Sequence, residues 1–164
     1  MKTLILMRHA KAAAPEADQR DYDRPLAPRG HRSAAALGDW LRAQGHVPQR
    51  ALVSGARRTQ QTFEGLGLTD TNLTLLPELY HAAPGGYLTA LRGRSEESLL
   101  LIGHNPAIGA LADSLLGGAR VPASLAAVPT GATFVFHCEA PDWEQLVRHP
   151  IRFVDGTIPR DFTD

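Results

Sequence analysis

The sequence predicts an α/β fold, a three-layer α/β/α sandwich around a largely parallel central sheet. Two short segments, residues 3–7 and 98–103, consist almost entirely of apolar residues, as strands buried on both faces do. Segments with a helical spacing of apolar residues alternate with such strands, and this alternation is typical of parallel sheets covered by helices. The length of 164 residues suits one domain, spanning residues 1–164.

The first half of the chain is expected to contain three strands and three helices. Residues 10–28, rich in Ala, Asp, Arg and Pro, should form a surface loop after the first strand. A helix over 28–44 is predicted because its apolar residues recur every three or four positions and Gly45 follows as a stop signal. The elements expected next are a strand over 51–54, a helix to about Gly65, a strand over 73–76 and a helix over 86–92.

The best-marked helix of the chain should follow the strand at 98–103. Asn105 can cap this helix, Pro106 suits its first position, and the apolar residues from 108 to 116 form one stripe. The remaining expectations are strands over 133–136 and 144–147 and a loose tail after Pro159.

Composition excludes several classes of protein. Seventeen basic residues balance seventeen acidic ones, which argues against a large nucleic-acid surface or an anchor to anionic membranes. A single cysteine, Cys138, excludes an intramolecular disulfide and a cysteine-based zinc cluster. The apolar start of the chain ends at Arg8, too early for a signal peptide, and the longest apolar runs are far too short to span a membrane. We expect a soluble, cytoplasmic protein without nucleic-acid or membrane partners.

Unusual polar residues follow three of the predicted strands. Arg8 and His9 follow the first strand, Arg57 and Arg58 follow the second, and His104 follows the strand at 98–103. Ligands of parallel sheets bind beyond the carboxyl ends of the strands, where helix N-termini point into the same crevice. If these strands are neighbours, two histidines and two or three arginines meet at one place.

Such a set of residues suits phosphoryl transfer. Arginines present forked donors to phosphate oxygens, and the N–H groups of helices starting near Ala56 and Pro106 favour an anion. A neutral imidazole can attack phosphorus and carry the phosphoryl group, and a second histidine, if protonated, would add positive charge. This chemistry needs no metal and no cofactor. A zinc site on His9 and His104 would lack a third ligand.

Each of these features also has a structural explanation. Arg8–His9 could be a solvated strand end, residues 103–106 a capped turn, and Arg57–Arg58 an exposed helix start. Arginine at a helix start opposes the helix dipole, however, which favours a bound anion there. The other histidines share no spacing and are expected to be structural or on the surface: His31, His46, His81, His137 and His149.

Three motifs, taken in order, resemble the histidine phosphatase (phosphoglycerate-mutase-like) superfamily. They are Leu6-Met7-Arg8-His9, Ser54-x-x-x-Arg58-x-x-Gln61-Thr62 and Gly103-His104-Asn105-Pro106. The short chain, the Arg-Pro-Leu-x-x-x-Gly segment at 24–30 and Glu78-Leu79-Tyr80 resemble the SixA-type phosphohistidine phosphatases of that superfamily. The similarity covers roughly residues 1–137. It implies a phosphoglycerate-mutase-like fold without a large cap insertion.

The resemblance also implies a role for individual residues. It makes His9 the nucleophile that accepts the phosphoryl group, and Arg8, Arg58 and His104 the groups that bind phosphate. Arg58, rather than Arg57, matches the arginine of the second motif, so Arg57 should face outward.

At two positions, 10 and 78, members of the superfamily differ from one another or from this chain. Ala10 stands where its usual first motif, Arg-His-Gly, has glycine. Glu78 lies in the region where many members have a carboxylate that protonates the leaving group, so it is a candidate general acid, although SixA-type members have no firm equivalent.

The function implied is that of a metal-independent phosphatase with a phosphohistidine enzyme intermediate. The expected substrate is phosphohistidine on a histidine-containing phosphotransfer protein, because a weak P–N bond with an imidazole leaving group needs no strong general acid. A short chain leaves little to roof the pocket, and an open pocket suits a side chain presented by another protein. The alternatives are a phosphatase of a small phosphorylated metabolite and a non-catalytic phosphate-binding module.

Overall fold

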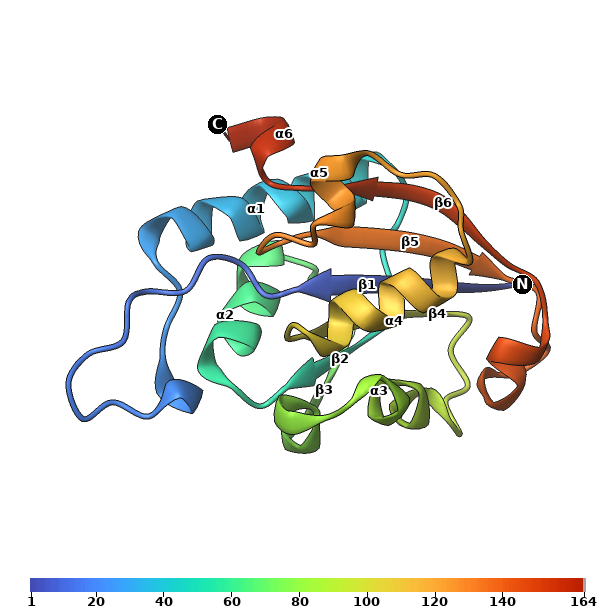
Figure 1. Ribbon diagram of the computed structural model, residues 1–164, viewed down its shortest axis with the longest axis horizontal. Helices are drawn as coiled ribbons and strands as arrows, with labels where there is room; N and C mark the ends of the chain where they lie inside the picture. The colour runs from blue at the N-terminus through green and yellow to red at the C-terminus, as the bar shows by residue number, and fades with distance from the viewer. Residues whose placement is uncertain (164) are drawn as a thin grey trace.

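The computed structural model describes residues 1–163, and a six-stranded sheet lies at its centre (Figure 1). In chain order the strands are β1 (Lys2–Arg8), β2 (Arg50–Ser54), β3 (Asn72–Leu76), β4 (Ser98–Gly103), β5 (Thr133–Cys138) and β6 (Ile151–Thr157). Across the sheet their order is β3-β2-β4-β1-β5-β6. Neighbours from β3 to β1 are parallel, whereas β5 is antiparallel to both β1 and β6. The largely parallel sheet expected from the sequence is therefore confirmed.

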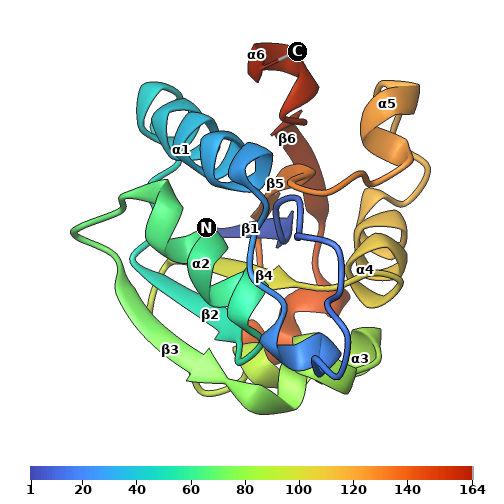
Figure 2. The same ribbon diagram turned by 90° about the vertical axis from the view of Figure 1, so that its left-hand side faces the viewer.

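Helices cover both faces of this sheet (Figures 1 and 2). On one face lie α1 (Pro28–Ala43) and α2 (Arg57–Leu66), and on the other lie α3 (Pro84–Leu91), α4 (Ala107–Leu116) and α5 (Ala123–Ala126). The chain also has 3-10 turns η1 (Asp21–Asp23), η2 (Pro77–His81) and η3 (Trp143–Arg148), and a short last helix α6 (Arg160–Thr163). The three-layer α/β/α arrangement expected from the sequence is therefore confirmed, and residues 1–163 carry no cap domain.

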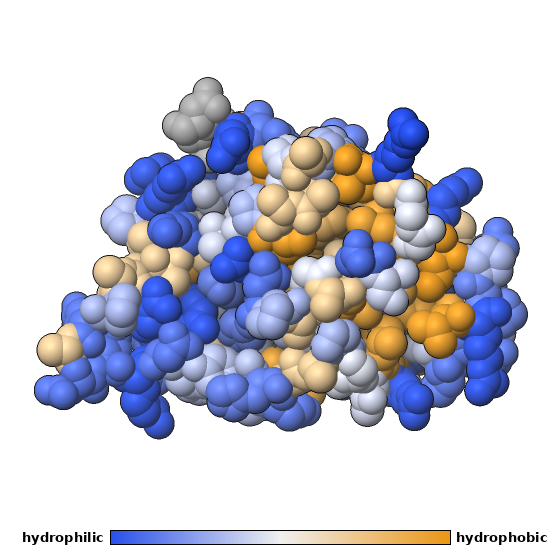
Figure 3. Space-filling view, in the orientation of Figure 1, coloured by the Kyte–Doolittle hydropathy of each residue, from blue (hydrophilic) through white to orange (hydrophobic). Residues whose placement is uncertain are grey.

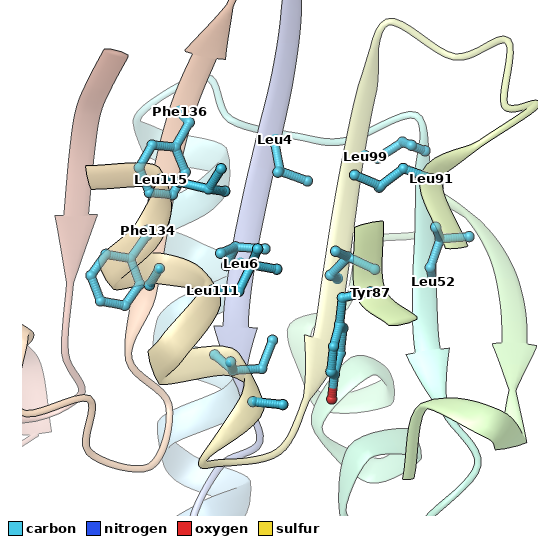
Figure 4. Close-up of a cluster of buried hydrophobic side chains, with 14 of the residues drawn as sticks. Leu4, Leu6, Leu52, Tyr87, Leu91, Leu99, Leu111, Leu115, Phe134 and Phe136 are labelled. Atoms are coloured by element: carbon cyan, nitrogen blue, oxygen red, sulfur yellow. The ribbon is translucent and has the colours of Figure 1, made fainter. Parts of the chain in front are cut away.

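Two hydrophobic cores hold the layers together, one on each face of the sheet. Leu4 and Leu6 of β1 pack with α4 on one face, beside Phe134 and Phe136 of β5 (Figure 4). The alternate residues of the same strand, Ile5 among them, pack against α1 and α2 on the other face. Because both sets of side chains are fully buried, β1 is apolar throughout instead of alternating. Each large aliphatic side chain buried in this way contributes about 1.5–3 kcal/mol.

The region after β5 differs from the sequence expectation. Residues 144–147, predicted as a strand, belong to the 3-10 turn η3, where the Asp142 carboxylate accepts a hydrogen bond from the Gln145 N–H group. Trp143 and Leu146 are buried from this turn, so its apolar residues serve the core without forming a strand. The last strand is instead β6, which the sequence analysis missed because this edge strand is only partly buried and has no continuous apolar run.

The tail after Pro159 was expected to be loose, and for residues 160–163 this expectation is wrong; residue 164 lies outside the described residues. Residues Arg160–Thr163 form α6. The Asp161 carboxylate accepts hydrogen bonds from the Thr157 hydroxyl and the Ile158 N–H group and so ties the turn to the end of β6.

The start of α4 also differs, by one residue. Pro106 occupies the N-cap position and the helix begins at Ala107. Asn105 still caps the helix, since its Oδ1 accepts a hydrogen bond from the Gly109 N–H group, but it does so from one position earlier than predicted. The Asn105 Nδ2 group donates to the Val128 carbonyl and so links this cap to the segment before β5.

Apolar and polar residues are distributed unevenly over the surface. Apolar residues gather over and beside α4, whereas the left-hand end, where the segment before α1 lies, is mostly hydrophilic (Figure 3). That polar end is also where β2, β4 and β1 finish side by side. Within residues 1–163 no helix is both long and apolar enough to cross a membrane.

Candidate active site

The three strand ends singled out in the sequence meet in the fold. Because β2, β4 and β1 are parallel neighbours, the residues that follow them come together at one edge of the sheet. A cavity of about 270 Å³ there is lined by Arg8, His9, Arg58 and His104. All four phosphate-site residues predicted from the sequence therefore lie around one cavity.

His9 is held in a defined orientation and charge state. Its Nδ1 atom lies 2.7 Å from the Ala10 carbonyl oxygen, which can only accept, so Nδ1 carries the proton. Nε2 is then unprotonated and accepts a hydrogen bond from Arg58 Nε at 3.3 Å. Burial, with the positive charges of Arg58 and Arg8, lowers the pKa of His9 to about 4, against the smaller raising effect of the Ala10 carbonyl. The result is a neutral imidazole whose Nε2 lone pair points toward Arg58.

Arg58 is clamped by the segment that precedes α1. Its two terminal nitrogen atoms donate to the Asp21 carbonyl at 2.8 Å and to the Asp21 carboxylate at 2.9 Å. The same carboxylate accepts from the Tyr80 hydroxyl and from Arg24. These donors, Tyr80 first, hold the pKa of Asp21 far below its usual range, so the carboxylate stays charged beside Arg58.

Sequence reasoning missed Asp21 and Tyr80 as site residues. Asp21 lies in a segment predicted only as a surface loop, and Tyr80 entered only as part of a motif resemblance. Asp21 contacts Arg58, which lies 37 positions further along the chain, and Tyr80, which lies 59 positions further. No local sequence pattern indicates either contact.

His104 is buried on the other side of the cavity. Its Nε2 atom lies 2.8 Å from the Ser54 Oγ, its backbone N–H group donates to the Tyr87 hydroxyl, and its ring centroid is 5.4 Å from that of His9. Burial, followed by the nearby His9 and Arg58, lowers the pKa of His104 to about 3. In the free protein this histidine is therefore neutral near pH 7, and it would contribute a hydrogen bond in place of the positive charge considered from the sequence.

Two buried side-chain nitrogen atoms within residues 1–163 have no hydrogen-bond partner, and both belong to this site. They are Arg8 Nε and His104 Nδ1. The Arg8 guanidinium is otherwise held by a 3.0 Å bond to the Val128 carbonyl. Leaving a buried donor unpaired costs about 1–3 kcal/mol. An oxyanion in the cavity is the kind of ligand that would satisfy both groups.

Other residues considered from the sequence lie elsewhere. Arg57 is exposed, as predicted, and lines a different depression on the far side of α2, so Arg58 is the arginine that faces His9. Glu78 is exposed on η2 and is not among the residues that line the catalytic cavity. His46 pairs with Asp155 at 2.8 Å, away from the site.

Comparison with known proteins identifies the family of this chain. The model of the histidine phosphatase superfamily (branch 1) matches residues 4–87, just over half of the chain. The chain therefore belongs to the histidine phosphatase superfamily. Phosphatase activity is what this membership supports.

Within that superfamily the chain is similar to SixA proteins. It is 33% identical to the phosphohistidine phosphatase SixA of Escherichia coli (strain K12) over 126 residues, which cover 73% of this chain and 77% of that protein. A structure from Nakamurella multipartitia, assigned by name to SixA, matches with a TM-score of 0.82 and 29% identity over 96% of both chains. A structure of the protein histidine phosphatase SixA complexed with tungstate matches with a TM-score of 0.76 and 28% identity, over 98% of this chain and 99% of that one.

Proposed function

We propose that this protein is a phosphohistidine phosphatase, which removes the phosphoryl group from a histidine side chain of a phosphotransfer protein through a phosphorylated His9. The observation that carries the proposal is the pair of unpartnered nitrogen atoms, Arg8 Nε and His104 Nδ1, in the cavity that His9 also lines. The chain's similarity to SixA proteins, one of them bound to the phosphate-like anion tungstate, supports the same assignment.

The reaction would proceed in two displacements. The His9 Nε2 lone pair attacks phosphorus, a new P–N bond forms on His9, and the P–N bond to the substrate imidazole breaks. A water molecule then attacks the phosphorylated His9, which releases inorganic phosphate and restores the neutral imidazole. Arg8 and Arg58 neutralise the oxygens of the transferring group in both steps, at a cavity whose burial strengthens these interactions.

His104 would act as a hydrogen-bond donor in these steps. The Ser54 hydroxyl can donate to His104 Nε2, which places the proton of the neutral ring on Nδ1, the unpartnered atom. This Nδ1–H group can then donate to a phosphoryl oxygen. A bound phosphoryl group, being negative, would also raise the pKa of His104 from its low value in the free protein.

The leaving group favours a phosphoramidate over an alkyl phosphate. No carboxylate lines the catalytic cavity among the described residues, and the Asp21 carboxylate is occupied by Tyr80, Arg24 and Arg58. An alkoxide leaving group needs a general acid, whereas an imidazole can leave already protonated. The exposed position of Glu78 adds to this argument against a small-metabolite phosphatase.

One experiment tests both the nucleophile and the substrate class. A phosphotransfer protein carrying ³²P-phosphohistidine should transfer label to this protein, and the trapped bond should be labile in acid and stable in alkali. His9→Ala should lose both the label and turnover. The same preparation should act more slowly on a panel of alkyl phosphates, and Glu78→Gln should leave phosphohistidine turnover nearly unchanged. Faster turnover of an alkyl phosphate, with a large loss in Glu78→Gln, would instead identify a metabolite phosphatase.

Two further expectations belong to this proposal. Residues 1–164 would act as one catalytic domain, because all six strands join one sheet. A cytoplasmic location, expected from the sequence, would give the enzyme access to cytoplasmic phosphotransfer proteins.

A further inference from the structure

A second cavity lies beside the catalytic one, between the start of α1 and the segment that enters α6. Its volume is about 170 Å³. Since roughly 10–15 Å³ of such space holds one water molecule, a small oxyanion with part of its hydration shell fits. Lys11 and Thr130 line both cavities, so the two share a wall. A group bound here would lie next to a phosphoryl group on His9.

The charged residues around this second cavity are all positive. Lys11, Arg29 and Arg160 line it, and no carboxylate of residues 1–163 does. Within residues 1–163 none of these three cations forms an ion pair. The carboxylate nearest in sequence, Asp161, is bound to groups at the end of β6. Among the described residues, therefore, no ion pair compensates the positive charge of this cavity.

The helix that borders the cavity adds to this charge. α1 has 16 residues, no acidic residue in its first turn and no side chain that caps its start. The Arg29 and Gly30 N–H groups have no acceptor in the part of the chain that the structure describes. Free N–H groups and the helix dipole together favour an anion at this end.

A buried hydroxyl provides an independent indication of a ligand. Ser33, one turn further along α1, lines the cavity and is only 3% exposed. Its hydroxyl forms no hydrogen bond with any residue in the range 1–163. Because Ser33 lines the cavity and its hydroxyl is not used within the described protein, this hydroxyl can donate a hydrogen bond to an oxygen atom of a bound anion.

We propose that this second cavity is an anion subsite that binds a carboxylate of the substrate protein, presented beside the phosphorylated histidine. The inference rests on the proposed function and extends it from the reaction to substrate recognition. Lys11, on the shared wall, would face both anionic groups, while Arg29, Arg160 and Ser33 would bind only the carboxylate. The preferred substrate is then a phosphohistidine flanked by acidic residues.

The subsite itself is tested by an NMR titration with sulfate as the probe. The amide signals of Gly30 and Ser33 should shift saturably in the wild type. Arg29→Ala should raise the Kd of this response at least fivefold, whereas Arg32→Ala should change it less than twofold. Arg32 is a matched control because it is exposed on the same helix and does not line the cavity. Absence of a saturable shift, or equal weakening in both variants, would overturn the subsite.

The nature of the ligand is tested with two phosphohistidine peptides, one with glutamates around the phosphohistidine and one with glutamines. The wild type and Arg32→Ala should favour the glutamate peptide about tenfold in kcat/KM, and Arg29→Ala should favour it less than twofold. Turnover of the glutamine peptide should be the same in all three proteins. Equal turnover of both peptides by the wild type would overturn the carboxylate assignment.

The two proposals fail in different ways. If neither peptide were dephosphorylated while an alkyl phosphate was, the proposed function and the carboxylate assignment would both be wrong. The sulfate titration would still decide whether the second cavity binds anions, because it does not depend on turnover.

Discussion

At the scale of single residues, the site depends on which hydrogen-bond partner each ring nitrogen and guanidinium has. The Ala10 carbonyl sets the His9 proton on Nδ1 and leaves Nε2 unprotonated. Asp21 holds Arg58 at two points, so its Nε–H group stays directed at His9 Nε2. In the proposed mechanism, the nucleophile and one phosphate-binding group are thus positioned before substrate binds, which would lower the cost of reaching the transition state.

Two neighbouring arginines provide a matched test of this arrangement. Arg58→Ala should lower kcat/KM by about 10²-fold or more, because it removes a forked donor from the transferring phosphoryl group. Arg57→Ala should change kcat/KM less than about threefold, since Arg57 is exposed outside the cavity. Steady-state kinetics on a phosphoramidate would measure both. A larger loss in Arg57→Ala would mean that the wrong arginine has been assigned.

The charge state of the two histidines can be measured directly. Burial gives His9 and His104 pKa values of about 4 and about 3, so neither ring should take up a proton between pH 8 and pH 5. Free histidine in the same buffer, with a pKa of about 6.5, should titrate within that range. The NMR chemical shifts of the imidazole carbons would report the protonation state of His9, His104 and free histidine. Titration of His9 near pH 6.5 would contradict a buried, neutral nucleophile.

At the scale of elements, α1 packs closely against the end of α2, the helix that begins with Arg57 and Arg58. Gly38 is buried in α1, and a Cβ atom there would overlap the backbone carbonyl of Leu66 at the end of α2. Only glycine allows the two helices to approach this closely. The packing of α2, the helix whose first turn carries Arg58, therefore requires glycine at this position.

Substitution of this glycine should destabilise the protein although alanine favours helices. Gly38→Ala gains about 1 kcal/mol in helix propensity, but separation of α1 from α2 should outweigh the gain and lower Tm by roughly 5 °C or more. Gly85→Ala is the control, since a Cβ atom in α3 at that position meets open space and should leave Tm unchanged or higher. Thermal unfolding followed by circular dichroism would compare them. An equal Tm for both variants would argue against the close approach.

At the scale of the whole molecule, the buried histidines link catalysis to stability. The folded protein keeps His9 and His104 neutral, whereas the unfolded chain protonates them near pH 6.5. Between pH 6.5 and pH 4 the unfolded state therefore binds more protons, so the free energy of unfolding falls as the pH falls. The burial that keeps His9 neutral, as its proposed role as nucleophile requires, therefore also lowers stability at acid pH.

This linkage predicts how the free energy of unfolding depends on pH, and His104→Gln should reduce that dependence. From pH 7 to pH 5 each of the two histidines should lower the free energy of unfolding by about 2 kcal/mol. His104→Gln removes one of these groups, so the free energy of unfolding of this variant should fall by about 2 kcal/mol less than that of the wild type between pH 7 and pH 5. Urea unfolding of both proteins at the two pH values gives the comparison. An identical pH dependence would show that His104 is not held neutral by the fold.

The sequence by itself determined the layered fold, five of the six strands, the three motifs and the four residues around the catalytic cavity. These features depend on short-range patterns: apolar runs give buried strands, and the residues that end parallel strands must meet at one edge of the sheet. Where the pattern was weak, at the partly buried β6 and in the turn η3, the prediction was wrong.

Only the tertiary structure decided how those residues are held. The Asp21 clamp on Arg58, the Ser54 partner of His104, the neutral state of both rings and the exposed position of Glu78 all depend on contacts between segments far apart in the chain. Burial and hydrogen bonding set these properties, and both arise only when the separate strand ends and the segment before α1 have packed together.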